Sequence, residues 1–239
     1  MDHRFLRAQA VLGSRAMDIL QSSHVAVLGL GGVGSWCAEA LARSGVGALT
    51  VMDEDVVCET NINRQCLAMN STIGRPKAEV MAERIRDIAP ECAVTALVGR
   101  YDAAQRERFF SARYDYIADA IDLVACKLDL ICTAIDRGVP IISALGTGNK
   151  LDATALRVCD ISKTEGDGLA RVVRKELRAR GVRHHTVVFS PEQGAAPEQT
   201  EAPPPGRRSV PGSLVWVPAS AGLLMCQHIV TQLIADRTE

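Results

Sequence analysis

Aromatic residues and net charge are both scarce in this sequence. Only 4% of its 239 residues are aromatic, while 47% are hydrophobic, and the formal net charge is −1. This composition favours the aliphatic interior of an α/β protein, and the length fits one large domain. The near-zero charge excludes a polycation, so any nucleic acid has to be bound by a local basic patch.

Paired cysteines and an apolar N-terminal leader are also lacking. The chain has eight cysteines, none in a Cys-x-x-Cys pair, which argues against a zinc site of the usual paired spacing. The residues ahead of the first expected strand include Asp2, His3, Arg4 and Arg7 and contain no long apolar run. We therefore expect no signal peptide, reduced thiols and a cytoplasmic protein.

Strands alternate with helices along most of the chain. This order predicts a single domain over residues 1–239, with a Rossmann-like, mostly parallel sheet flanked by helices and joined by right-handed crossovers. The expected strands cover residues 24–29, 48–52, 92–98, 114–120, 139–145, 156–160 and 186–189. The expected helices cover residues 14–23, 31–43, 76–89, 102–112, 125–137 and 168–180.

The last fifty residues differ in character from the rest. Residues 191–212 are rich in Pro, Gly, Ala and Glu and predict a flexible loop within the domain. The apolar segment 213–234 is expected to form a strand, a turn at Pro218 and a helix from Ser220. A membrane span is the alternative, but Pro218 and several polar residues interrupt the apolar run.

A glycine-rich turn lies between the first expected strand and the helix after it. It contains Gly29, Gly31, Gly32 and Gly34, and Asp53 ends the next expected strand. Glycines let the backbone approach a phosphate, the helix N-terminus supplies N–H donors, and the acid can bind a ribose hydroxyl. The pattern indicates an adenosine-containing nucleotide without separating NAD from ATP; the alternative is a turn made only for packing.

Charged and polar residues after this turn favour ATP. Asn61, Arg64 and Gln65 follow Asp53 closely, and Lys77 stands at the start of an expected helix. Arg64 and Lys77 would present two cations to phosphates, which a triphosphate needs more than a dinucleotide does. Asp122 follows the fourth expected strand, where a carboxylate can hold Mg²⁺. Taken singly, each cation could be a surface charge and the acid a helix cap.

These motifs together resemble the adenylation domain of the ubiquitin-activating-like superfamily, which includes activators of sulfur-carrier proteins. The resemblance implies ATP and Mg²⁺ as cofactors. It places Gly32 and Asp53 on the nucleotide, Asn61, Arg64 and Lys77 on its phosphates, and Asp122 at the metal. It also implies a homodimer in which an N-terminal arginine, matched by Arg7, reaches the ATP of the other subunit.

Within that superfamily the sequence is most similar to the bacterial tRNA threonylcarbamoyladenosine dehydratases. That resemblance implies an enzyme that uses ATP to cyclise the threonylcarbamoyl group on the adenosine 3′ to the tRNA anticodon, with release of water. Sulfur-transfer or tRNA-modification proteins are candidate partners. The glycine turn is weakly specific, and the later blocks are more so. The matching blocks are residues 4–5, 31–36, 77–85, 119–122, 160–164, 169–171, 188–190, 210–213 and 221–222.

Two departures bear on the alternatives. No cysteine stands between Cys159 and Cys226, where thioester-forming members of the superfamily carry a thiol, so an activator of a carrier protein is less well supported. Residues 165–168 lack a cysteine that some dehydratases carry, which leaves the role of that loop open. A dehydrogenase or a non-catalytic nucleotide-binding module is the third reading, but it gives Arg64, Lys77 and Asp122 no evident role.

A basic segment near the C-terminus is the candidate tRNA contact. Residues 171–185 contain six Arg and Lys side chains followed by His184 and His185. Such cations can bind successive phosphates of an RNA backbone. The alternative is a solvated helix face with no partner. Arg207 and Arg208 in the expected loop could add to the patch.

Overall fold

Seven strands form one sheet in the order β3-β2-β1-β4-β5-β7-β6. Every neighbouring pair is parallel except β6 and β7, which are antiparallel. This computed structural model describes residues 3–196, 198 and 211–236. It confirms the predicted Rossmann-like, mostly parallel sheet. The strands are β1 (His24–Leu28), β2 (Ala48–Asp53), β3 (Ala93–Val98), β4 (Tyr116–Asp119), β5 (Ile141–Ala144), β6 (Arg157–Asp160) and β7 (Thr186–Phe189).

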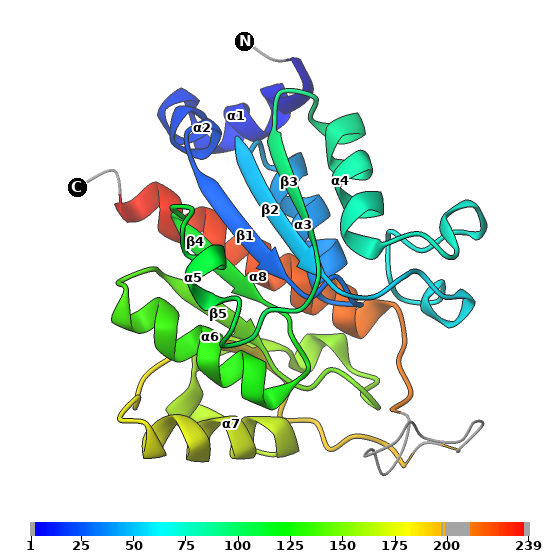
Figure 1. Ribbon diagram of the computed structural model, residues 1–239, viewed down its shortest axis with the longest axis vertical. Coiled ribbons are helices and arrows are strands. Elements are labelled where there is room, and N and C mark those ends of the chain that lie inside the picture. The colour runs from blue at the N-terminus through cyan, green and yellow to red at the C-terminus, as the bar shows by residue number, and fades with distance from the viewer. Residues whose placement is uncertain (1–2, 197, 199–210, 237–239) are drawn as a thin grey trace.

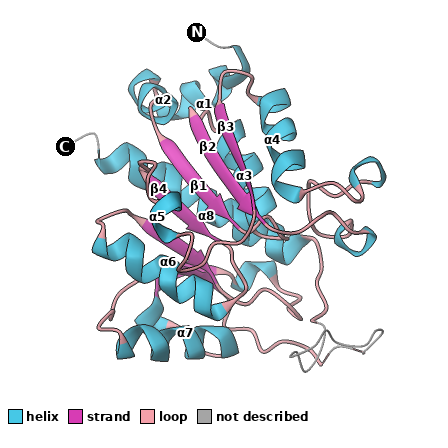
Figure 2. Ribbon diagram, in the orientation of Figure 1, coloured by secondary structure: helices cyan, strands magenta, loops and turns pink. Residues whose placement is uncertain are grey.

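Helices cover both faces of the sheet (Figures 1 and 2). One hydrophobic core contains residues of α2, α3, α4 and α8, and a second contains residues of α5, α6 and α7. Figure 1 shows α8 behind the sheet and α6 in front of it. The helices are α1 (Leu6–Leu12), α2 (Ser14–Gln21), α3 (Gly34–Arg43), α4 (Lys77–Ile88), α5 (Arg106–Phe109), α6 (Val124–Asp136), α7 (Gly168–Ala179) and α8 (Trp216–Asp236).

The central strand β1 shows why these residues form a buried strand. Its side chains alternate between the two cores: Val25 and Val27 belong to one, and Ala26 and Leu28 belong to the other. All four are almost completely buried. Successive side chains of a strand point to opposite faces, so a strand covered on both faces needs a continuous apolar run. This explains the unbroken run of apolar residues after His24.

The C-terminal segment differs from the prediction, because α8 begins at Trp216 and residues 211–215 form no strand. Pro218 therefore lies in the first turn of a helix instead of forming a turn between a strand and a helix. Proline is tolerated there, since the first backbone N–H groups of a helix have no partner within it. The β-branched residues before Pro218 suggested a strand that the structure does not contain.

Helix α8 packs into the protein. Val217, Ala221, Met225, Ile229 and Leu233 are all buried and recur every four residues, so they form one stripe against the core. By length and composition the helix could cross a membrane, but half of its most apolar window is buried inside the protein. The stripe explains this apolarity as that of a core helix.

Two other predictions differ near the edges of the fold. Of the expected helix 102–112, only Arg106–Phe109 is helical, because the Asp102 carboxylate accepts hydrogen bonds from the N–H groups of Ala104 and Gln105 and holds a turn. Helix α1 was not predicted. It buries none of its residues, so it carries no apolar periodicity that the sequence could show.

Candidate nucleotide-binding site

A pocket of about 450 Å³ opens at the carboxyl ends of β1, β2, β4 and β5. The strand order reverses between β1 and β4, and open α/β sheets bind ligands at such a switch point. The structure brings every predicted site residue except Gly34 and Arg7 to the wall of this pocket. Those residues are Gly29, Gly31, Gly32, Asp53, Asn61, Arg64, Gln65, Lys77 and Asp122.

The glycine turn has one packing end and one open end. Gly29 has φ +84°, and a Cβ there would lie 2.6 Å from the carbonyl oxygen of Ala120. A Cβ on Gly34 would lie 1.8 Å from the carbonyl oxygen of Gly29, so Gly34 lets α3 approach the strand and does not line the pocket. A Cβ on Gly31 would meet nothing within 4 Å. The open side of this turn can therefore receive a ligand beside the N-terminus of α3.

Asp53 ends β2 and fixes the position of the glycine turn. Its Oδ2 accepts a hydrogen bond from Leu30 N at 2.5 Å, and its Oδ1 accepts one from Asp55 N at 2.8 Å. Burial raises the pKa of this carboxyl, and the nearby Lys77 charge and the two N–H groups oppose that effect. Each oxygen keeps a further lone pair, so the carboxylate can also accept from a ribose hydroxyl.

Lys77 enters the pocket from the first turn of α4. Its side chain is buried, and its Nζ lies 2.8 Å from Oδ2 of Asp55, which is exposed. Lys77 N also donates to Asp55 O at 3.0 Å, so this pair joins the end of β2 to the start of α4. An ammonium group has three donors, and two remain for other acceptors such as phosphate oxygens.

Arg64 and Gln65 lie on a short turn beside the glycines. Nη1 of Arg64 donates to Thr60 O at 2.8 Å and to Asn63 Oδ1 at 3.1 Å, and burial lowers the pKa of its guanidinium. Gln65 is buried, and within the described residues its Oε1 is the one buried side-chain oxygen or nitrogen without a hydrogen-bond partner. A buried acceptor left unpaired at a pocket wall fits a ligand that donates a hydrogen bond.

Asn61 has a role in holding this turn. Its Oδ1 accepts a hydrogen bond from Cys58 N at 3.0 Å, and its own N–H donates to Cys58 O at 3.0 Å. Trp36 on α3 donates from Nε1 to Arg64 O at 3.0 Å, which ties the same turn to the helix after the glycines. The turn is thus fixed from both sides before any ligand binds.

Asp122 reaches the pocket from the turn after β4. Asp119 and Lys127, for which no role was predicted from the sequence, hold this turn. Asp119 Oδ1 accepts a hydrogen bond from Ile121 N at 3.0 Å, and its Oδ2 accepts one from Lys127 Nζ at 2.6 Å. Both side chains of the ion pair are completely buried. The available signal was a lysine among the apolar residues of the helix 124–136, because a buried cation requires an anionic partner.

The far wall of the pocket was also missed. It is formed by Gly146, Gly148, Pro211 and Ser213, which come from segments distant in the sequence. Asn149 joins these segments, because its N–H donates to Gly212 O at 2.8 Å and its Oδ1 accepts from Gly212 N at 2.6 Å. Its left-handed backbone conformation is visible only in the structure, although asparagine is a common residue for it.

The structure gives the loop over residues 165–168 a structural role. Asp167 caps α7 by accepting from Ala170 N at 2.6 Å, and its Oδ2 lies 2.9 Å from Nζ of Lys150. Both charged groups are buried, and Lys150 also donates to Ser190 O at 2.8 Å. The loop therefore anchors α7 to the segment after β5.

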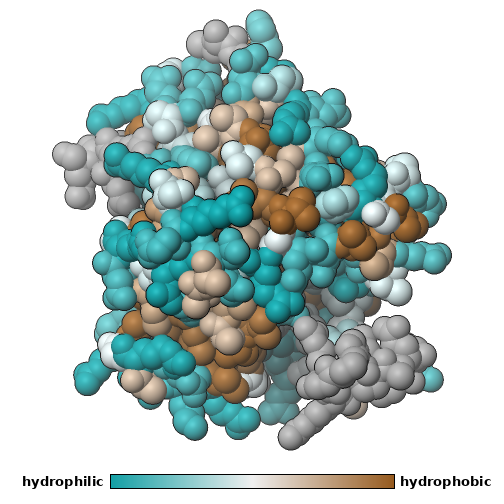
Figure 3. Space-filling model, in the orientation of Figure 1, coloured by the Kyte–Doolittle hydropathy of each residue, from teal (hydrophilic) through white to brown (hydrophobic). Residues whose placement is uncertain are grey.

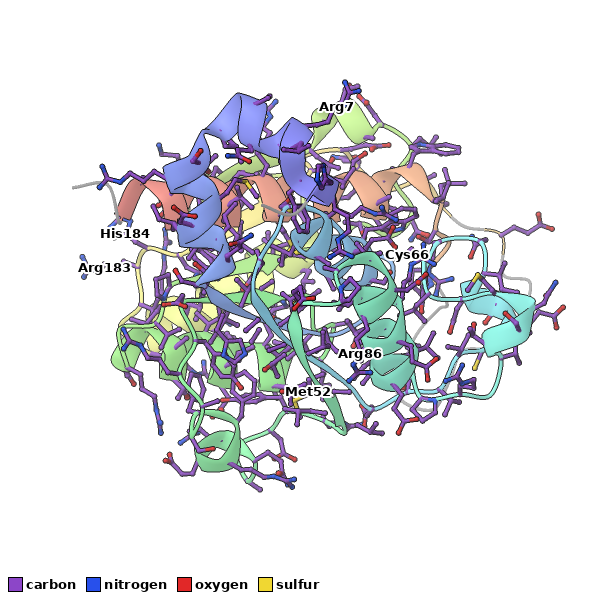
Figure 4. All side chains as sticks on the ribbon, turned by 90° about the horizontal axis from the view of Figure 1, so that it is seen from above. Arg7, Met52, Cys66, Arg86, Arg183 and His184 are labelled. Atoms are coloured by element: carbon purple, nitrogen blue, oxygen red, sulfur yellow. The ribbon has the colours of Figure 1, made fainter. Side chains whose placement is uncertain are left out.

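Arg7 lies on α1, away from the residues that line the pocket. Figure 4 shows it at the outer edge of the molecule. Any contact between Arg7 and a bound nucleotide therefore requires the pocket of a second copy. In the described residues no group of three or more His, Cys, Asp or Glu side chains could hold a metal ion. A divalent ion at Asp122 would need oxygens from the ligand and water, which is the usual way in which Mg²⁺ binds beside phosphates.

The fold and this pocket define a class of protein: a nucleotide-binding α/β protein whose glycine turn, ribose-binding acid and two cations suit a triphosphate. The chain belongs to the ThiF family, which matches residues 4–239. It is 42% identical to the tRNA threonylcarbamoyladenosine dehydratase of Bacillus subtilis, across 99% of this chain and 96% of that protein.

Solved structures agree with this assignment. The crystal structure of the Escherichia coli tRNA N6-threonylcarbamoyladenosine dehydratase in complex with ATP superposes with a TM-score of 0.89 at 36% identity. The match covers 98% of this chain and 95% of that one. The complex of the same protein with AMP gives the same TM-score and coverage. The predicted fold and family are thereby confirmed.

Proposed function

We propose that this protein is an ATP-dependent dehydratase that cyclises the threonylcarbamoyl group of N6-threonylcarbamoyladenosine in tRNA. One observation carries the proposal: nearly the whole chain matches a dehydratase whose crystal structure contains ATP. The pocket geometry supports it, because the phosphate-binding turn, Asp53 and two cations meet in one place.

The chemistry explains why such an enzyme needs ATP. A carboxylate is a poor electrophile, since its charge resists attack and its oxygen is a poor leaving group. Transfer of the carboxylate to AMP, with loss of pyrophosphate, makes AMP the leaving group. An oxygen or nitrogen of the carbamoyl group then attacks the same carbonyl carbon, closes the ring and expels AMP. Because both groups belong to one side chain, proximity supplies much of the acceleration.

The pocket residues have separate roles in this proposal. The Asp53 carboxylate binds the ribose, and Arg64 and Lys77 bind the phosphates and stabilise the charge that develops as pyrophosphate leaves. The Asp55 carboxylate holds the Lys77 ammonium group in place at 2.8 Å. Asp122 would hold Mg²⁺, which when bound offsets phosphate charge. Gln65 offers its unpaired Oε1 to a donor on the nucleotide or the substrate.

We further infer a homodimeric, cytoplasmic enzyme in which residues 1–239 act as one adenylating unit. Helix α1 exposes Leu6, Val11 and Leu12, and none of its residues is buried in this subunit. Exposed apolar side chains of this kind fit a protein interface. A partner subunit that covers α1 would carry Arg7 toward a second pocket, as the family resemblance predicts.

Activation of a ubiquitin-like sulfur-carrier protein is the competing function. Such enzymes adenylate a protein C-terminus, and many then transfer it to a thiol. The sequence offers no cysteine between Cys159 and Cys226, and burial raises the pKa of both of these thiols. Neither feature favours thiol transfer at this site.

The product balance of ATP cleavage tests the proposed function. The protein is incubated with ATP and Mg²⁺, and AMP and pyrophosphate are measured with tRNA that carries threonylcarbamoyladenosine. The matched control is the same tRNA transcribed without modification. We expect both products to form with the modified tRNA alone. Equal release with both tRNAs, or release only with a sulfur-carrier protein, would contradict the proposal.

A further inference from the structure

Helix α7 separates its basic side chains into two groups, although the sequence shows them as one run. Arg171, Lys175 and Arg178 are exposed and lie at spacings of four and three residues, which places them along one flank of the helix. Ala170, Val173 and Leu177 form the buried face. The two groups of cations therefore have different surroundings.

Arg174 of α7 and Arg180, which follows the last residue of the helix, are engaged within the fold. Arg174 is half-buried and donates from Nη1 to Thr164 O at 2.6 Å. Arg180 binds Glu176, the single acidic residue of the helix, at 2.7 Å, and its charge acts on Cys132 of α6. Glu176 and Arg180 lie four residues apart on one flank of the helix. The opposite flank keeps its three cations without an ion pair to any described residue.

The surface agrees with this division. Figure 3 shows an apolar area between the positions of α6 and α7, with hydrophilic side chains along the lower margin of the molecule beneath it. Val172 on α7 and Ile135 on α6 are both exposed apolar residues. Figure 4 shows Arg183, which follows α7 in the chain, at the outer edge of the molecule.

Helix α7 begins beside the nucleotide pocket, because Leu169 in its first turn lines that pocket. Arg171 stands in the same turn of the helix, on the side opposite to Leu169. From Arg171 to Arg178 the helix rises by about 10 Å at roughly 1.5 Å per residue. Three cations over that length can bind neighbouring phosphates of one RNA strand.

We propose that Arg171, Lys175 and Arg178 form a phosphate-binding flank that holds the tRNA backbone along α7, the helix whose first turn lines the nucleotide pocket. The proposal rests on the proposed function, and it assigns a surface to the tRNA. The protein as a whole has a net charge of −1, so attraction of RNA has to come from such a local group. Arg174, Arg180 and Glu176 do not belong to this proposed RNA-binding flank, because each is bonded within the fold.

Salt dependence of tRNA binding provides the test. The variant Arg171→Gln/Arg178→Gln is compared with Arg86→Gln/Arg113→Gln, which removes two exposed arginines from other parts of the fold. Binding of tRNA that carries threonylcarbamoyladenosine is measured between 50 and 300 mM KCl, about the range over which counterion release is resolved. Thermal unfolding of each variant checks that these surface changes leave the fold intact.

We expect the α7 variant to bind roughly 10- to 30-fold more weakly near 0.15 M salt and to lower the slope of log K against log salt by about 1.5. The control variant should keep the wild-type slope and affinity, and both variants should keep the wild-type KM for ATP. If the wild type converts the nucleoside but the α7 variant binds tRNA as tightly as the control variant does, α7 is not the tRNA-binding surface and the proposed function stands. If the wild type neither binds nor converts the tRNA, both proposals fail.

Discussion

The Lys127 ammonium group lies 2.6 Å from the Asp119 carboxylate, and both side chains are completely buried. The pair holds the turn that carries Asp122 into the pocket, because the second oxygen of Asp119 binds Ile121 N. A buried charge that loses its partner is strongly destabilising. The structure of the candidate site therefore depends on an ion pair that does not itself line the pocket.

Removal of one partner from this pair should destabilise the protein. We expect Lys127→Met to lower the free energy of unfolding by about 3–5 kcal/mol, because it leaves the Asp119 carboxylate buried and unpaired. The double variant Asp119→Leu/Lys127→Met should lose less, since it buries no unpaired charge. Urea unfolding measures both. A double variant at least as unstable as Lys127→Met would contradict this account of the pair.

Changes to the pocket itself should affect catalysis and not stability. We expect Asp122→Ala and Arg64→Ala to lower the rate of pyrophosphate release by at least about 100-fold, because each removes a group that acts on phosphate charge in the transition state. The control is Glu165→Ala, an exposed acid that does not line the pocket. Unchanged turnover in either site variant would remove that residue from the proposed role.

Asn149 joins the segments that form the far wall of the pocket. It has φ +61°, it exchanges hydrogen bonds with Gly212 through its N–H and its Oδ1, and its carbonyl accepts from Ala195 N. We expect Asn149→Gly to lose about 1 kcal/mol of stability with the side-chain hydrogen bond. Asn149→Ala should lose about 1–2 kcal/mol more, because alanine is strained in the left-handed region.

Urea unfolding and the KM for ATP together test the role of Asn149. Both variants should raise the KM, since Pro211 and Ser213 line the pocket next to Gly212. If Asn149→Ala proves as stable as Asn149→Gly, backbone conformation does not explain the choice of asparagine. An unchanged KM in both variants would show that the far wall does not contact the nucleotide.

A buried histidine should make stability depend on pH. His185 binds Ser143 at 2.8 Å, and burial, together with the charge of Lys127, lowers its pKa to about 3. The unfolded chain has an ordinary histidine pKa of about 6.5 and binds more protons between these values. The contribution of His185 to stability is therefore complete above pH 6.5 and is lost as the pH falls toward 3.

Urea unfolding between about pH 4.5 and 7.5 measures this contribution. Relative to the wild type, His185→Gln should reduce the slope of unfolding free energy against pH by up to about 1.4 kcal/mol per pH unit below pH 6. Ser143→Ala keeps the buried imidazole and should keep most of the wild-type slope. An identical slope in the His185 variant would show that this histidine does not titrate on unfolding.

The sequence predicted the features that depend on local chemistry. The strand pattern, the glycine turn and the order of polar residues predicted that Asp53, Arg64, Lys77 and Asp122 lie close together, and all four line the pocket, because parallel strands bring their carboxyl ends to one edge. The sequence of the glycine turn does not show that Gly34 serves packing, because this role follows from how closely Gly34 approaches the backbone of Gly29 in the fold.

Features that depend on contacts between distant segments were not predictable from the sequence. The buried partner of Lys127, the hydrogen bonds of Asn149 and the pairing of Lys150 with Asp167 each join residues whose proximity only the fold creates. The start of α8 was predicted wrongly because Pro218 is compatible with both a turn and a first helical turn. Residue 197 and residues 199–210 of the predicted loop, including Arg207 and Arg208, lie outside the described residues.

The mass of the modified nucleoside tests the central claim most directly. Purified protein is incubated with ATP, Mg²⁺ and tRNA that carries threonylcarbamoyladenosine, and the digested nucleosides are analysed by mass spectrometry. We predict that this nucleoside loses the mass of one water molecule, and that the loss requires ATP and is absent with Asp122→Ala. An unchanged mass, with an intact substrate and an enzyme shown to bind ATP, would contradict the dehydratase assignment.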